Sequence, residues 1–379
     1  MQETTKSQVR INGCDAFRRR VASLFLGGFE GPTLTLEMAE LLNGGLRGVV
    51  LFARNAGPPD RVRRLTAEVR AEGGAGCLVA VDQEGGRVAR LRDGFWVPPA
   101  MREFGRAADP GLAFEMGAAV GRQLHGVGVN FNFAPVLDVD TNPANPVIAD
   151  RALGAERGVV AELGAAIVRG LQSRGVAACG KHFPGHGDTH QDSHRTLPRV
   201  EHDENRLKAV EWVPFKQAVS EGVAAVMTAH LVLGRIDPGV PATMSEKILR
   251  GTLRDGLGFD GVIVSDDLEM HAIVDRYPIG EAAVRAIAAG VDLVLICHRA
   301  DRVREAIDTV VAAVRAGRLS TEKVGEAAAR VDRLAQRYVW TPDETEAVTG
   351  LPVDAELAKR CAGRDRGDGE RSAADPTIY

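Results

Sequence analysis

The sequence predicts an α/β chain that folds as a (β/α)8 TIM-type barrel with a single catalytic domain. Short β-branched runs alternate with segments of helical periodicity along most of the 379 residues, which indicates βαβ units and a parallel sheet. Glycine, the residue that closes a helix C-terminus, recurs just before the strands. An open doubly wound sheet is the competing arrangement. It is disfavoured because no G-x-G-x-x-G follows the first predicted strand.

The predicted elements follow one another in a regular order. The strands are expected at Val21–Leu26, Gly48–Phe52, Leu78–Asp82, Val129–Val136, Ala177–His182, Ala224–Thr228, Val262–Asp266 and Asp292–Cys297. Apolar residues three and four apart predict helices at Asp60–Ala71, Phe114–Leu124, Val159–Gln172, Arg206–Ser220, Lys247–Asp255, Glu281–Ala288, Asp301–Ala316 and Ser320–Arg337.

Three segments are expected: an N-terminal extension over 1–20, the barrel over 21–340 and a polar tail over 341–379. The tail is expected to be disordered in part, because Ala362–Asp375 shows no periodicity. Hydrophobic residues make up 45% of the chain, which excludes wholesale disorder. The formal net charge is −4, so we expect neither nucleic acid nor an anionic membrane as a partner.

Targeting and cysteine patterns favour a cytoplasmic protein. No run of 18 apolar residues occurs, and the apolar stretch Val21–Phe29 is too short to span a bilayer and lacks a cleavage site. The five cysteines are widely spaced and form no C-x-x-C, so we expect reduced thiols and no cysteine zinc site. No obligate protein partner is evident.

Ionisable residues end six of the predicted strands. Chemistry in a (β/α)8 barrel takes place at the C-terminal ends of its strands, so this pattern predicts a ring of polar side chains at one barrel mouth. The residues concerned are Asp82, Asp138 and Asp140, Lys181 and His182, His230, Asp266 and Asp267, and His298.

The segment Lys181–Pro198 contains histidines four residues apart, at His182, His186, His190 and His194. On a helix this spacing would place four metal ligands on one face. Proline and glycines at 184, 185 and 187 break any helix, so the segment is expected to be a loop. A metal site assembled from this loop remains an alternative.

Two motifs supply candidate catalytic groups. In Asp192-Ser193-His194, the carboxylate can orient the imidazole and raise its pKa, which suits a general acid. Asp266, at the end of its strand, can act as a carboxylate nucleophile, whereas its neighbour Asp267 is expected as a helix N-cap.

The segment Asp82–Arg90, with the sequence DQEGGRVAR, has the composition of a sugar-binding loop. Its glycines allow close backbone approach, and its carboxylates and arginines can hold a polyhydroxylated substrate. The alternative is a surface turn with a salt bridge.

Several motifs together resemble the bacterial β-N-acetylhexosaminidases of glycoside hydrolase family 3. They are KHFPGHG followed by DSH, DQEGGRV, FAPVLDV, DRA and GFDGVIVSDDLEM, in family order between Gly44 and Ile296. The resemblance implies a (β/α)8 barrel with Asp266 as nucleophile, His194 as acid/base and Asp192 as the partner of His194. It also implies sugar contacts from Asp82, Arg90, Arg151, Lys181, His182 and His230.

The implied reaction is the retaining, exo-acting release of terminal β-linked N-acetylglucosamine, as in the recycling of peptidoglycan (muropeptide) fragments. Asp266 would form a covalent glycosyl-enzyme while His194 protonates the leaving oxygen and then activates water. The implied ligand is a carbohydrate, with no cofactor and no metal. Phosphorolysis at the same residues is the closest alternative, followed by a metal-dependent hydrolase that uses the histidine-rich loop. A β-glucosidase and a non-catalytic sugar-binding barrel are disfavoured, the latter because Asp266 and His194 are both present.

Overall fold

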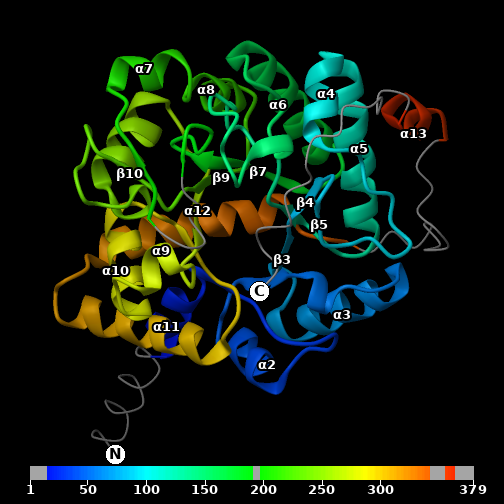
Figure 1. Ribbon diagram of the computed structural model, residues 1–379. Coiled ribbons are helices and arrows are strands. Elements are labelled where there is room, and N and C mark those ends of the chain that lie inside the picture. The colour runs from blue at the N-terminus through cyan, green and yellow to red at the C-terminus, as the bar shows by residue number, and fades with distance from the viewer. Residues whose placement is uncertain (1–14, 191–196, 342–354, 363–379) are drawn as a thin grey trace, which may run out of the picture.

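A computed structural model describes residues 15–190, 197–341 and 355–362 and shows the predicted barrel (Figure 1). Eight parallel strands form a closed ring in which β1 pairs with both β2 and β12. The strands are β1 (Phe25–Gly27), β2 (Gly48–Leu51), β3 (Leu78–Val81), β6 (Phe131–Asn132), β7 (Ala177–Phe183), β9 (Ala225–Thr228), β11 (Val262–Asp267) and β12 (Leu293–Ile296). A strand overlaps each of the eight predicted ranges, but β1 begins four residues after the start of the predicted Val21–Leu26, since Val21 and Ala22 are helical.

Strand β6 is much shorter than the predicted Val129–Val136 because a proline interrupts it. Pro135 has no N–H to donate to a neighbouring strand. Pairing with β7 stops after Asn132 and returns only as a single bridge between Val136 and Lys181. The segment stays beside β7, since the Ala134 and Pro135 carbonyl oxygens accept from the N–H groups of Cys179 and Lys181 at 2.9 and 3.1 Å.

Helices surround the barrel (Figure 1). They are α2 (Leu36–Asn43), α3 (Pro59–Gly73), α4 (Met101–Ala107), α5 (Pro110–Gly126), α6 (Arg157–Gln172), α7 (Glu204–Ala209), α8 (Val213–Ser220), η4 (Lys247–Gly256), α9 (His271–Val274), α10 (Ile279–Ala289) and α11 (Ala300–Arg315). The predicted helix Arg206–Ser220 is wrong as one unit. Pro214 lies in the first turn of a new helix, where its missing N–H costs nothing, so α7 and α8 form separately.

The N-terminal end of the barrel is filled by apolar side chains and closed by α12 (Thr321–Arg337), orange in Figure 1. Leu334 and Tyr338 pack with the side chains that point into the barrel, such as Phe131. The buried Asn130 amide donates to the carbonyl oxygen of Tyr338 at 2.9 Å, which fixes the end of α12 beneath the strands. Among the residues that the structure describes, this packing leaves the opposite end of the barrel interior for a ligand.

The segment after β3 folds back as a hairpin of β4 (Gln83–Gly85) and β5 (Val88–Ala89). The buried Gln83 side chain accepts from the N–H groups of Arg90 and Leu91 at 3.0 Å. Gly86 has φ +53, and a Cβ there would lie 2.8 Å from Cα of Ala100, so glycine is required. The alternative of a surface turn is wrong, because both strands of the hairpin are buried.

A short helix, α13 (Ala355–Ala362), lies within the polar tail and contacts α5. Leu357 and Cys361 are buried, and Arg360 pairs with Glu115 at 2.6 Å. In the described part of the chain, no helix combines the length and the apolarity needed to cross a bilayer.

Candidate active site

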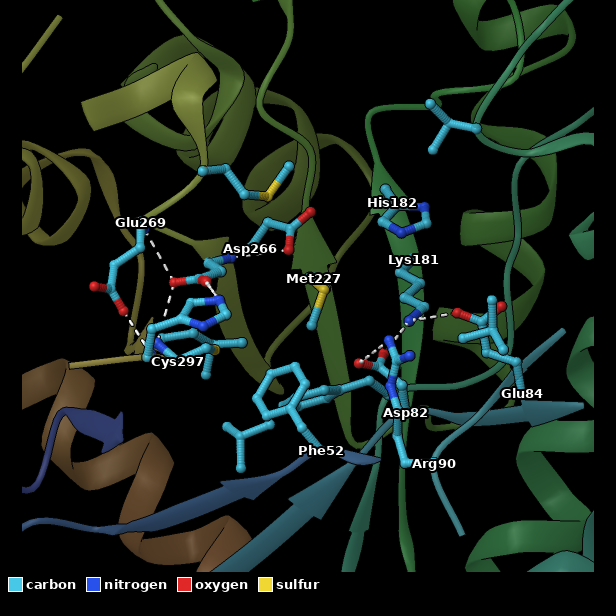
Figure 2. A pocket seen from close by; sticks show the side chains of 18 of the residues that line it. Phe52, Asp82, Glu84, Arg90, Lys181, His182, Met227, Asp266, Glu269 and Cys297 are labelled. Carbon is cyan, nitrogen blue, oxygen red and sulfur yellow. Dashed lines mark hydrogen bonds and ion pairs between the residues drawn. The ribbon is translucent and has the colours of Figure 1, made fainter. Parts of the chain in front are cut away.

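A cavity of about 320 Å³ opens at the C-terminal ends of the barrel strands. Its walls come from side chains that follow or end β2, β3, β6, β7, β9, β11 and β12 (Figure 2). Nine residues singled out from the sequence line it: Asp82, Arg90, Arg151, Lys181, His182, His186, Asp266, Asp267 and His298. Asp192 and His194, the predicted acid/base pair, lie outside the described residues.

One wall of the cavity is a buried array of alternating charges. Lys181 Nζ lies 2.6 Å from Asp82 Oδ1 and 2.7 Å from Glu84 Oε1 (Figure 2). Arg151 donates two hydrogen bonds to Glu84, from Nη2 to Oε1 at 2.8 Å and from Nε to Oε2 at 2.9 Å. Arg90 Nη2 lies 3.5 Å from Asp82 Oδ2. Donors and acceptors thus alternate along this wall.

Buried partners of opposite sign favour the ionised forms of Glu84 and Lys181 in this array. Burial alone would raise the pKa of Glu84, but Arg151 and Lys181 outweigh it and hold that pKa well below its usual range. Burial alone would lower the pKa of Lys181, but Asp82 and Glu84 raise it. Fixed ionic donors and acceptors of this kind suit the hydroxyl groups of a sugar.

Asp138, which does not line the cavity, orients the neighbouring His182. Its Oδ2 lies 2.7 Å from His182 Nδ1, and its Oδ1 accepts from the His186 N–H at 2.6 Å. The pKa of Asp138 is lowered: burial raises it, but His182 and His186 outweigh that effect. With Nδ1 engaged in this way, His182 Nε2 is turned toward Arg151 Nη2, at 3.4 Å.

The regularly spaced histidines have separate environments. Burial and the nearby His182 lower the pKa of His186 to about 4, so this ring is neutral near pH 7. His186 Nδ1 contacts Thr189 Oγ1, whereas His190 Nδ1 contacts the Asn142 amide. Among the residues that the structure describes, no three His, Cys, Asp or Glu side chains are arranged to hold a metal ion. The four-residue spacing of these histidines therefore belongs to a folded loop in this part of the segment, and not to one face of a helix.

Asp266 stands at the end of β11 and lines the cavity opposite the charged array (Figure 2). Its Oδ1 accepts from the N–H of Asp267 at 2.8 Å. The carboxylate of Asp267 accepts from the N–H groups of Glu269 and Cys297 at 3.0 and 3.2 Å. Asp267 therefore caps the turn after β11 and not a helix, since α9 begins only at His271. Together these bonds fix the backbone on which Asp266 is mounted.

His230 does not line the cavity that the described residues form, so its predicted sugar contact stays a prediction. Its side chain is fully buried, and the cavity lining does not include it. Nε2 lies 2.9 Å from the carbonyl oxygen of Asp267, and Nδ1 lies 2.8 Å from Thr243 Oγ1. His230 thus supports the end of β11 from behind. Asp140 is likewise buried away from the cavity, where it pairs with Arg102.

Sequence reasoning assigned no individual role to Glu84, although the structure places it at the centre of the charged wall. It also missed Phe52 and Glu269, which line the cavity from the ends of β2 and β11. The available signal for Glu84 was its place in the segment DQEGGRVAR, whose carboxylates were expected to hold a polyhydroxylated substrate.

The model of the glycosyl hydrolase family 3 N terminal domain matches residues 31–334 of this chain. The chain belongs to this family. A protein of Thiobacillus denitrificans named beta-hexosaminidase is 36% identical over 374 residues, which cover 97% of this chain and 95% of the relative. A beta-hexosaminidase of Methylobacillus flagellatus is 40% identical over 264 residues, covering 68% and 75%.

Solved structures agree with this family assignment. A family 3 β-N-acetylglucosaminidase from a Paenibacillus species has a TM-score of 0.89 and 40% identity, covering 93% of this chain and 70% of its own. NagZ from Neisseria gonorrhoeae, solved in complex with N-trifluoroacetyl-D-glucosamine, has a TM-score of 0.70 and 35% identity, covering 82% and 98%. The predicted membership of glycoside hydrolase family 3, and with it the predicted enzyme class, is confirmed.

Proposed function

We propose that this family 3 hydrolase is a retaining exo-β-N-acetylglucosaminidase that releases terminal β-linked N-acetylglucosamine. The observation that carries the proposal is a single cavity in which Asp266 faces the buried array of Asp82, Glu84, Arg151 and Lys181. The names of the similar proteins support the sugar: beta-hexosaminidase for relatives and β-N-acetylglucosaminidase for a solved structure.

The graded exposure of the cavity walls supports exo action. The array side chains are almost completely buried, as expected for the end of the cavity that receives a terminal sugar unit. Side chains beyond Asp266, such as His271, are exposed. The sugar to be released would therefore occupy the closed end, and the aglycone would extend through the open end.

The proposed chemistry needs two groups, one on each side of the glycosidic bond. The carboxylate of Asp266 attacks the anomeric carbon, the bond from that carbon to the leaving oxygen breaks, and His194 gives its proton to that oxygen. His194, held by Asp192, then removes a proton from water, which attacks the same carbon and frees Asp266. The charged array holds the sugar hydroxyls through both steps.

Following the family resemblance of the KHFPGHG and DSH motifs, we extend the proposal to muropeptide fragments of peptidoglycan as substrate and to the cytoplasm as location. A carbohydrate is the ligand that the array supports, since its fixed donors and acceptors complement hydroxyl groups.

The proposal is tested by turnover of 4-nitrophenyl β-N-acetylglucosaminide in phosphate-free buffer that contains a chelator. We expect release of 4-nitrophenol, with the β-anomer of N-acetylglucosamine as first product by NMR. A requirement for phosphate, with a sugar phosphate as product, would instead identify a phosphorylase. A requirement for zinc would identify a metal-dependent hydrolase, and inactivity under all three conditions a binding protein.

His194→Ala is expected to slow substrates with poor leaving groups by about 10²–10⁴-fold, because their oxygen must be protonated as the bond breaks. A 2,4-dinitrophenyl glycoside needs little protonation and should lose far less in the glycosylation step. The measurement is kcat/KM for both substrates, with Asp192→Asn as a second variant that should show the same trend more weakly. Equal losses for both leaving groups would argue against the acid role.

A further inference from the structure

The open end of the cavity has a wall of its own, formed by residues that follow β11 and β12. Side-chain exposure rises from 2% at Lys181 and 15% at Asp82 to 33% at His298 and 58% at His271. If the released sugar occupies the closed end, this wall is the part of the protein that meets the aglycone.

His298 is held in this wall by contacts of both its backbone and its ring. Its backbone N–H donates to Glu269 Oε2 at 2.6 Å, and its Nε2 lies 3.4 Å from Asp267 Oδ2. Its ring packs against Phe52 with 5.9 Å between ring centroids. Within the described part of the chain, the other ring nitrogen, Nδ1, has no hydrogen-bond partner.

The charges that face His298 come from three elements. Asp267 belongs to β11, Glu269 follows it, and Arg54 belongs to η1 (Ala53–Asn55). The bond to Asp267 raises the pKa of His298; burial and Arg54 oppose this effect, and Glu269 adds to it. In its protonated form the ring carries an N–H at Nδ1 as well as at Nε2.

We infer that His298 is a specificity-determining residue, whose Nδ1–H donates a hydrogen bond to an oxygen of a carbohydrate aglycone. The inference rests on the proposed exo-glycosidase function. It names the aglycone as the part of the substrate that the site recognises beyond the cleaved bond. A second sugar offers ring and hydroxyl oxygens as acceptors, whereas a plain phenyl group offers none. His298 thus favours oligosaccharide substrates over aryl glycosides.

The test compares N,N'-diacetylchitobiose with phenyl β-N-acetylglucosaminide as substrates of wild type and two variants. His298→Phe keeps a ring against Phe52 and removes both nitrogens. We expect its kcat/KM for the disaccharide to fall about tenfold more than its kcat/KM for the phenyl glycoside, as loss of a charge-assisted hydrogen bond predicts. His298→Asn keeps an N–H donor and should retain most of the preference.

His125→Phe is the control, because it removes an imidazole that packs against Trp340 and does not line the cavity. We expect its effect on the two substrates to be equal. If His298→Phe lowers kcat/KM equally for both substrates, the inference is overturned, whatever the size of the loss. Equal losses would indicate that His298 only positions Asp267.

Wild-type enzyme supplies a readout that no folding defect can disturb. As pH rises through the raised pKa of His298, Nδ1 becomes an acceptor, so KM for the disaccharide should rise relative to KM for the phenyl glycoside. An unchanged ratio would also overturn the inference. Failure of wild type to hydrolyse either substrate would instead count against the proposed function itself.

Discussion

Replacing Asp266 by alanine is expected to lower kcat/KM for 4-nitrophenyl β-N-acetylglucosaminide by at least about 10⁴-fold, because it removes the carboxylate that we propose attacks the anomeric carbon. The expectation follows from its position at the end of β11, facing the array that would hold the sugar. A good leaving group does not rescue this variant, since the missing step is formation of the bond to carbon and not protonation of oxygen.

Asp267→Asn is the matched control for this experiment. Asp267 is the adjacent carboxylate and also lines the cavity, but its Oδ1 is committed to the N–H groups of Glu269 and Cys297. We expect a loss of about 10²-fold or less, from disturbed positioning of its neighbour. Thermal unfolding of both variants checks that the fold survives.

Covalent trapping adds a readout that identifies the atom involved. A 5-fluoro glycosyl fluoride of N-acetylglucosamine should add one sugar mass to the wild-type protein, on a peptide that contains Asp266. Labelling of Glu269 or Asp267 in its place, or comparable losses from Asp266→Ala and Asp267→Asn, would remove Asp266 from its assigned role.

The strands were predictable because each one is a short apolar run whose burial is a local property of the sequence. The errors lie where a proline changes the backbone. Pro135 ends β6 early, and Pro214 begins α8 as a new helix. Both prolines are visible in the sequence, but which side of a proline keeps its hydrogen bonds is decided by neighbouring elements.

The site was predictable to the extent that strand ends meet at one barrel mouth. That rule alone places Asp82, Lys181 and Asp266 around one cavity. It fails for His230, which also follows a strand but turns behind β11 to contact the carbonyl oxygen of Asp267. The direction of a side chain in the first residues after a strand depends on loop packing, which no periodicity in the sequence encodes.

Glu84 was missed for a related reason: its partners are remote in sequence. Arg151 is 67 residues away, and the two meet only because the hairpin of β4 and β5 folds back over the barrel mouth. A carboxylate next to two glycines is usually a solvated turn residue. Here it is buried between two cations, and its substitution has the largest expected effect on stability.

Glu84→Ala is expected to lower the free energy of unfolding by about 3–5 kcal/mol, because Arg151 and Lys181 would stay buried without a shared counter-charge. Activity should fall as well, since both cations line the cavity. Glu84→Gln keeps the shape and one acceptor, so its loss should be smaller. Urea unfolding at pH 7 measures the free energy of unfolding of both variants. Glu40→Gln, which removes an exposed partner of Arg304, should cost less than about 1 kcal/mol.

The dependence on pH separates a charge effect from a packing effect. The pKa of Glu84 lies lower in the folded protein than in the unfolded chain, so its contribution to stability is present above the unfolded pKa of about 4.3. That contribution is lost as pH falls toward the folded pKa. The difference in unfolding free energy between wild type and Glu84→Gln should therefore shrink steadily below about pH 4. A difference that stays constant from pH 7 to pH 3 would mean that Glu84 acts through its shape, and that the charged wall is not what holds Lys181 and Arg151 in the cavity.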